Sequence, residues 1–175
     1  MGDGRRIIVG VSGSLANLEV LRAAVRITRR DRGRLCAVTA WTAPGGESLA
    51  PQPVPAALLG EWVRAAHDRQ REAFDQALGG VPGDIEVATY VVRGRPAPVL
   101  LGFADRPDDL LVVGSGRTGL FHRGVHAVGP YCAARCACPV LLVPPPPMVR
   151  ESRRLLHRVR AVSPSALAPA RSAGS

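Results

Sequence analysis

Short apolar runs alternate with longer amphipathic stretches over residues 1–144 of the chain. The runs with the length and branched side chains of buried strands are Ile7–Val11, Leu35–Trp41, Asp84–Val92, Asp109–Val113 and Pro139–Val143. Helical spacing marks the intervening segments Leu15–Asp31, Pro55–Leu78 and Pro96–Ala104, and a fourth helix is expected to end near Ala137. This alternation predicts an α/β fold, a doubly wound parallel sheet with helices on both faces.

The first two helices each have a recognisable apolar side. In the first, Leu18, Leu21 and Val25 recur at spacings of three and four, and Gly33 is expected to stop the helix. The second is expected to bury the side formed by Leu58, Trp62, Ala66, Ala73 and Ala77. Residues 42–54, rich in proline and glycine, are expected to form a loop before it.

The pattern changes after Val143. Pro144–Pro147 fits neither a sheet interior nor a helix, and the residues beyond are mainly Arg, Ser, Ala and Pro. We therefore expect one folded domain over residues 1–144 and a basic, disordered tail over residues 145–175. Within the tail, Glu151–Val159 is a candidate short helix.

Composition narrows the class of protein. The formal net charge is +9, and all the basic residues are arginines. These arginines are dispersed, and aromatic residues make up only 4% of the chain, which argues against nucleic acid as a partner. The N-terminal apolar run is too short for a secretion signal or a membrane span, so no membrane partner is expected and a cytoplasmic location is predicted.

Candidate binding residues lie where the predicted strands end. In doubly wound sheets, ligands bind outside the carboxyl ends of the strands, which here are Val11-Ser12, Ala40-Trp41 and Val113-Gly114. The stretch Gly114–Gly119, with the letters GSGRTG, follows a strand and precedes a helix. Glycine amides and a helix N-terminus favour a phosphate, and Arg117 can add charge.

Two common phosphate-binding motifs do not fit this glycine-rich stretch. A dinucleotide fingerprint requires an acidic residue about 20 positions later, but no Asp or Glu occurs between Asp109 and Glu151. A Walker loop requires a lysine, and the chain has none.

A family resemblance gives the third interpretation. The closing segment DLLVVGSGRTGLFHRGVHAVGPYCAARCACPVLLVP (Asp109–Pro144) resembles the end of universal stress protein domains. The opening segment RRIIVGVSGSLANLEVLRAAV and the later LCAVTAW are similar to the start of those domains. The resemblance covers residues 5–144 and implies a Rossmann-like sheet of five parallel strands in the order 3-2-1-4-5. It also implies a regulatory domain of the stress response that binds an adenine nucleotide, ATP, and is at most a weak ATPase.

The resemblance also implies site residues. In the family the motif G-x2-G-x9-G-[ST] follows the fourth strand. Counting back from Pro139 places His126 at its third glycine, Ala127 at its Ser/Thr and Val128 next in line, with Gly116 at the second glycine. A second alignment matches Gly116, Gly119 and Gly129 but puts Pro130 at the Ser/Thr. Nucleotide-binding members carry an aspartate where this chain has Ser12, and their adenine contacts the backbone at the place of Ala40.

Two function hypotheses follow. One is a nucleotide-binding regulatory domain with weakened ATP affinity, and the other is a dimeric scaffold that has lost the nucleotide. The resemblance implies a homodimer through the last strand, Pro139–Val143, with Val140 and Leu142 buried at the interface. Neither hypothesis includes covalent catalysis, because residues 10–14 lack the last glycine of a G-x-S-x-G elbow. An ATPase activity is expected to be weak at most, because no general base is recognisable.

A metal site is not expected from the sequence. Cys132, Cys136 and Cys138, with His122 and His126, lack the two-pair spacing of a zinc site. We expect these cysteines to be small packing residues against the sheet.

Overall fold

The computed structural model describes residues 4–43, 55–115 and 127–147. It divides the chain into two units, Met1–Pro145 and Pro146–Ser175, and the elements below all belong to the first. The predictions of a disordered tail and of a helix at Glu151–Val159 fall outside the described residues.

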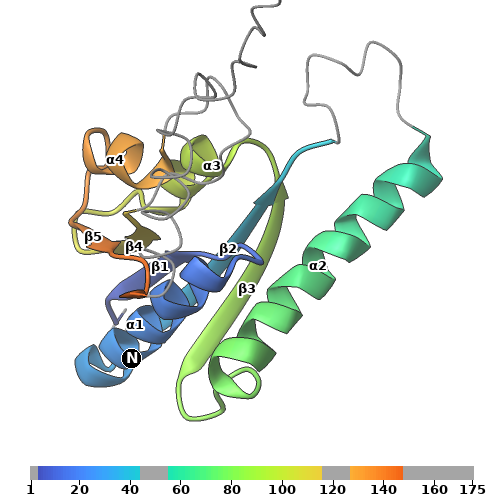
Figure 1. The fold of residues 1–175 in the computed structure, drawn as a ribbon. Coiled ribbons are helices and arrows are strands. Elements are labelled where there is room, and N and C mark those ends of the chain that lie inside the picture. The colour runs from blue at the N-terminus through green and yellow to red at the C-terminus, as the bar shows by residue number, and fades with distance from the viewer. Residues whose placement is uncertain (1–3, 44–54, 116–126, 148–175) are drawn as a thin grey trace, which may run out of the picture. The chain divides into compact units, whose positions relative to one another are not determined.

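Nine elements follow one another in the described ranges (Figure 1). They are β1 (Arg6–Gly10), α1 (Leu15–Asp31), β2 (Arg34–Trp41), α2 (Ala56–Leu78), β3 (Glu86–Arg93), α3 (Pro96–Phe103), β4 (Leu110–Gly114), α4 (Val128–Ala133) and β5 (Val140–Val143). All neighbouring strands pair in parallel, in the order β3-β2-β1-β4-β5. The predicted fold class and strand order are therefore confirmed.

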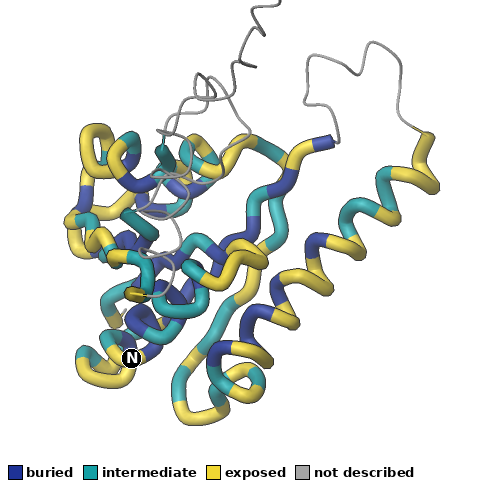
Figure 2. The backbone as a smooth tube through the Cα atoms, viewed as in Figure 1, coloured by how far each residue is buried: buried dark blue, intermediate teal, exposed yellow. Residues whose placement is uncertain are grey.

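Alternate residues of the strands supply two separate cores. On one side of the sheet Ile7 and Val9 pack with α1 and α2, including the fully buried Phe74. On the other side Ile8 packs with α3 and α4, where Leu100 and Cys132 are buried. Figure 2 shows the buried residues along the strands and the inner sides of the helices. The central strand β1 is buried on both faces because helices cover both, as a parallel sheet requires.

α1 spans Leu15–Asp31 as predicted, but the residue that ends it is not the expected glycine. The C-cap is Arg32, which adopts the left-handed conformation (φ 49°, ψ 38°), whereas Gly33 follows it with an ordinary φ. Gly33 is required for another reason: a Cβ there would overlap the carbonyl oxygen of Arg5 and lie 2.7 Å from Ile7 Cδ1. The glycine therefore serves the close approach of the chain before β1 to the start of β2.

Two other helix predictions are corrected, namely the end of α4 and the buried side of α2. α4 ends at Ala133 rather than near Ala137, because the chain turns at Ala134 and bends at Ala137 and Cys138 to enter β5. In α2, Leu58 is 38% exposed, and the buried residues lie between Ala66 and Ala77. The first turns of α2 extend beyond the sheet that covers its second half (Figure 1).

The amino ends of β1 and β4 are joined by an ion pair. Arg6 donates from Nε and Nη2 to the two carboxylate oxygens of Asp109, at 2.9 and 2.6 Å. The Asp109 side chain is 1% exposed and also accepts from the backbone N–H of Arg106 at 3.1 Å.

No helix in the described ranges is both long and apolar enough to cross a lipid bilayer.

Candidate functional site

The sheet brings the predicted site residues of three strands to one edge. β1 is the central strand and pairs with β2 on one side and β4 on the other, so that Gly10 lies opposite Val38 and Val9 opposite Val112. The backbone N–H of Val11 donates to the Val38 carbonyl at 2.8 Å, which extends this pairing one residue past β1. Ser12 follows β1, Ala40 lies near the end of β2 and Gly114 ends β4, so all three lie at the carboxyl edge of the sheet.

The site residues on these strands differ in accessibility. Val11 and Val113 are buried at 5% and 3% exposure and belong to the core. Ala40 and Gly114 are half-buried, and Ser12 is exposed. The last three are therefore the more accessible of these five residues.

Asn17 holds the loop between β1 and α1. Its Nδ2 donates to the Gly10 carbonyl at 2.7 Å, and its Oδ1 accepts from the Ser12 N–H at 2.7 Å. This amide bridges the last residue of β1 and the first exposed residue after it. Asn17 was not predicted as a site residue, although a polar residue four positions before Leu21, on the buried side of α1, was a usable signal.

The serines of this loop do not act as a hydrogen-bonded helix cap. Ser14 occupies the N-cap position of α1, but its side chain makes no capping hydrogen bond. Its Oγ instead lies 3.2 Å from Ser12 Oγ. The Ser14 carbonyl accepts from the Asn17 N–H at 2.8 Å, so a backbone hydrogen bond begins the helix. The hydroxyls of Ser12 and Ser14 both belong to exposed residues.

The first turn of α4 rests on the end of β4. Ala127 is the N-cap of α4, its carbonyl accepts from the Tyr131 N–H at 3.1 Å, and Ala127 and Val128 are both half-buried. A Cβ on Gly129 would overlap the Gly114 carbonyl oxygen and lie 3.0 Å from Leu142 Cδ2. Gly129 therefore allows the first turn of α4 to approach the end of β4 closely.

Two polar side chains near this edge were not singled out from the sequence. The Cγ and Cδ atoms of Arg69, on α2, are within 3.9 Å of the place a Cβ on Gly13 would occupy, so this exposed arginine reaches the β1–α1 loop. Thr39 lies one residue before Ala40 and is 3% exposed, and its Oγ1 has no hydrogen-bond partner among the described residues. An arginine whose stem lies beside the loop and a buried hydroxyl on β2 are both features that a polar ligand can exploit.

The rest of the predicted site lies outside the described residues. Gly116, Arg117 and His126, together with Gly119 of the second alignment and His122, fall between Ser115 and Ala127. The predicted phosphate contacts from these positions remain predictions.

The cysteines and the shifted pKa values belong to other parts of the fold. Burial raises the pKa of the Cys132 thiol to about 11 and also raises that of Cys36. At the amino edge of the sheet, the hydrogen bond from Arg6 lowers the pKa of Asp105. In the described ranges no three His, Cys, Asp or Glu side chains are placed to hold a metal ion.

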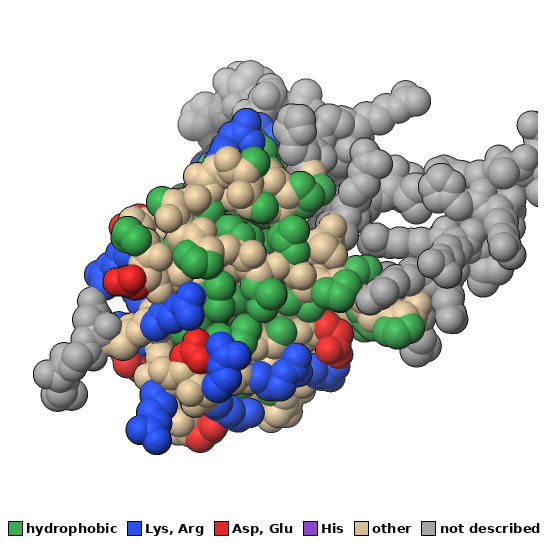
Figure 3. Space-filling model, turned by 90° about the vertical axis from the view of Figure 1, so that its left-hand side faces the viewer, with side chains coloured by type: hydrophobic (Ala, Val, Ile, Leu, Met, Phe, Trp, Pro, Cys, Tyr) green, Lys and Arg blue, Asp and Glu red, His purple; other side chains and the backbone are tan. Residues whose placement is uncertain are grey.

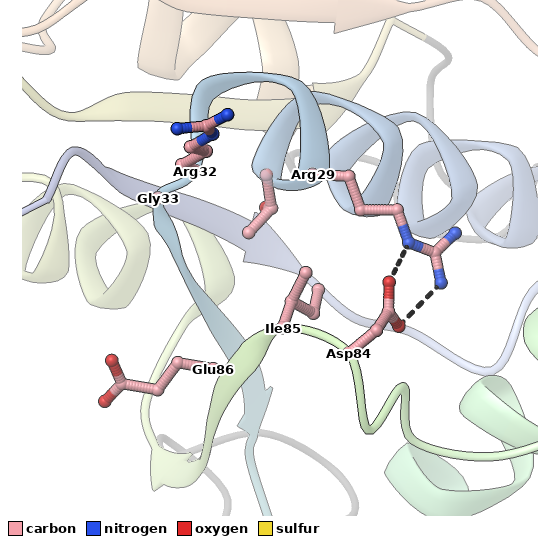
Figure 4. A pocket seen from close by; sticks show the side chains of 7 residues that line it. Arg29, Arg32, Gly33, Asp84, Ile85 and Glu86 are labelled. Atoms are coloured by element: carbon pink, nitrogen blue, oxygen red, sulfur yellow. Dashed lines mark hydrogen bonds and ion pairs between the residues drawn. The ribbon is translucent and has the colours of Figure 1, made fainter.

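A cavity of about 450 Å³ lies at the opposite edge of the sheet, between the end of α1 and the start of β3. Figure 4 shows Arg29 turned toward Asp84, with Nε and Nη2 donating at 2.6 and 2.9 Å, while Arg32 lies on the far side. Glu86, which also lines it, pairs with Arg34 at 3.1 Å. Since these acidic side chains already have arginine partners, we assign the candidate site to the carboxyl edge instead.

Comparisons with known proteins agree with this geometry. The family model described as the universal stress protein family matches residues 4–144. No curated protein sequence matches the chain.

Several solved structures share the fold. Universal stress protein UspA from Lactobacillus plantarum superposes with a TM-score of 0.62 at 24% identity, covering 82% of this chain and 99% of that one. A universal stress protein in complex with cAMP gives a TM-score of 0.50 at 27% identity, covering 81% and 98%. A protein of the same family from Burkholderia pseudomallei gives 0.52 at 20% identity, covering 82% and 98%.

Proposed function

The chain belongs to the universal stress protein family, and on that premise we propose that it is a regulatory protein of the stress response that binds an adenine nucleotide. The ligand we propose is ATP, held at the carboxyl ends of β1, β2 and β4. The protein acts by binding and carries no catalytic step, beyond at most a weak ATPase activity.

The observation that carries this proposal is the Asn17-held loop. It keeps Ser12 exposed at the end of the central strand, between Ala40 on β2 and Gly114 on β4. Ligands of doubly wound sheets bind at this position, where crossovers leave the central strand in opposite directions. The 27% identical universal stress protein in complex with cAMP supports an adenine nucleotide as the ligand class.

At two positions this chain lacks a polar group of the full family motif, so we expect ATP to bind less tightly than in members that have it. Ser12 offers a hydroxyl instead of a carboxylate acceptor, and Ala127 offers no hydroxyl donor at the start of α4. A lost hydrogen bond costs about 0.5–1.5 kcal/mol, and up to about 3 when one partner is charged. Two such losses weaken binding by about tenfold to a thousandfold. Arg69 is the side chain that offsets part of this loss, since it lies beside the loop.

Isothermal titration of the full chain with ATP, and separately with cAMP, tests the proposal. Ser12→Asp combined with Ala127→Ser should strengthen ATP binding, and adding His126→Gly should strengthen it further. Asp84→Asn, at the opposite edge of the sheet, is the control that should leave affinity unchanged. Absence of binding to either nucleotide at millimolar concentration would refute the proposed function, and submicromolar ATP affinity in the unmodified chain would refute the site assignment.

A second candidate function, a dimeric scaffold without a nucleotide, is favoured by the surface of β5. This edge strand leaves Leu141 and Leu142 exposed by 38% and 36%. In Figure 3, which faces the side where β5 and α4 lie, hydrophobic side chains gather in the middle of the face. An uncovered apolar edge strand favours pairing with a second copy, and we propose a homodimer through residues 139–143.

Light scattering at micromolar concentration tests the dimer. Leu142→Glu should convert the protein to a monomer, whereas Leu58→Glu, at an equally exposed leucine on α2, should not. A monomer with the unmodified sequence would rule out this assembly. A dimer that copurifies without nucleotide and does not bind ATP would favour the scaffold over the nucleotide-binding function.

A further inference from the structure

Two cysteines lie side by side where the chain passes from α4 into β5. The Sγ atoms of Cys136 and Cys138 are 3.3 Å apart. The backbone bends at Ala137 and Cys138, which brings these two side chains to the same side of the chain. A disulfide has an S–S distance of about 2.05 Å, so the two sulfur atoms need to approach by only about 1.3 Å to bond.

The two thiols differ in their access to solvent. Cys138 is 7% exposed and packs in the core between the sheet and α3, and burial raises the pKa of its thiol to about 12. Cys136 is half-buried at the margin of the same core, with Sγ 3.8 Å from the carbonyl oxygen of Ala104. Cys136 is therefore the thiol that a small molecule can reach from solvent.

The other two cysteines of the chain provide a contrast. Cys132 is fully buried on α4, and Cys36 is 5% exposed on β2. Both pack among apolar side chains of the same core, as expected for small packing residues. The pairing of Cys136 with Cys138 is not needed for such packing, because a single small residue fills a core position without a second thiol beside it.

We propose that Cys136 and Cys138 form a reversible thiol–disulfide site that reacts with hydroperoxides. The Cys136 thiolate attacks the outer oxygen of the peroxide, the O–O bond breaks, and the departing oxygen takes a proton to leave as water or an alcohol. Cys136 then carries a sulfenic acid. Cys138 Sγ attacks Cys136 Sγ, and the displaced hydroxide takes the Cys138 proton to leave as water.

The reaction balances as one two-electron exchange. Two thiols and one hydroperoxide give one disulfide, one water and one alcohol or second water. A dithiol reductant reverses it by thiol–disulfide exchange. Because Val140 opens β5 only two residues after Cys138, the bond would fix the bend that leads into this edge strand.

Peptide mapping of the unmodified full chain tests this site. Trypsin cleavage after Arg135 and Arg150 releases a peptide that contains Cys136 and Cys138 and no other cysteine, while Cys132 and Cys36 fall in separate peptides. After treatment of the native protein with hydrogen peroxide and then an alkylating agent, this peptide should be lighter by two hydrogen masses and unalkylated. A dithiol should restore alkylation at both residues.

Variants distinguish an internal pair from general thiol oxidation. Cys138→Ser should leave a sulfenic acid on Cys136 that a dimedone-type reagent captures, and Cys136→Ser should slow the oxidation of Cys138 by about tenfold or more, because only the buried thiol remains. Cys36→Ala is the matched control and should leave the pair unchanged. If peroxide leaves both thiols of the unmodified protein open to alkylation, or oxidises Cys136 only to irreversible acids, the proposal is wrong.

Discussion

Replacing Arg6 with methionine would remove the cation that faces the buried carboxylate of Asp109. Arg6 contacts both oxygens of that carboxylate, and the Asp109 side chain is 1% exposed. Methionine keeps much of the length and apolar stem of arginine but cannot donate a hydrogen bond. In the variant, the described hydrogen bond that remains to Asp109 comes from the backbone N–H of Arg106.

The size of the effect follows from burial. Removing one partner of a buried ion pair costs about 3–5 kcal/mol, because the remaining charge is left uncompensated. The Arg6 side chain is 21% exposed, so water can partly reach the space it leaves, and we expect the lower value, about 3 kcal/mol. For a chain of this length, that loss lowers the Tm by about 6–12 °C.

The chain contains a matched control for this experiment. Arg29 also donates to both oxygens of Asp84 from Nε and Nη2, at 2.6 and 2.9 Å, but both side chains are about half exposed. Arg29→Met should therefore change stability little, since solvent replaces an exposed pair. Thermal and urea unfolding of both variants, followed by circular dichroism, gives the comparison. Equal losses from the two substitutions would refute the explanation based on burial.

Three further predictions concern stability. Burial raises the pKa values of Cys132 and Cys138 from 9.0 to about 11 and 12, so the folded state favours the neutral thiols. Their contribution to the free energy of unfolding is full below pH 9 and should be lost as pH rises toward 12. Urea titrations over this pH range should detect the loss. Gly129→Ala should destabilise the protein because its Cβ meets the Gly114 carbonyl, whereas Gly60→Ala, on an open side of α2, should stabilise it by about 0.5–1 kcal/mol; equal Tm shifts would contradict this. Deleting residues 148–175 should leave the Tm nearly unchanged, and a large drop would show that the tail contributes to the fold.

Local sequence signals located most elements because they report local physical requirements. The apolar run at Ile7–Val11 and the three-and-four spacing of Leu18, Leu21 and Val25 needed no partner to be recognised, and β1 and α1 formed where they indicated. Gly33 misled the prediction for a physical reason. A glycine is required at position 33 because a Cβ there would overlap the carbonyl oxygen of Arg5. Arg5 is distant in sequence from the end of the helix that Gly33 was expected to cap.

In the candidate site, too, some residues could be placed from the sequence and some contacts could not. The carboxyl ends at Ser12, Ala40 and Gly114 could be placed from the order of strands and helices, because parallel strands end at one edge. The Asn17 bridge could not, since it depends on where Gly10 O and Ser12 N–H lie once the loop has formed. Nor could the reach of Arg69, on α2, to the loop after β1.

By itself, the sequence determined the family, the α/β class and the edge of the sheet where a ligand would bind, since these depend on periodicity and on motifs read along the chain. Only the tertiary structure decided which polar groups become neighbours. It buried Asp109 against Arg6, set Gly129 against Gly114, and brought Cys136 to 3.3 Å from Cys138. Such contacts follow from packing between segments, because burial and close approach exist only after strands and helices have come together.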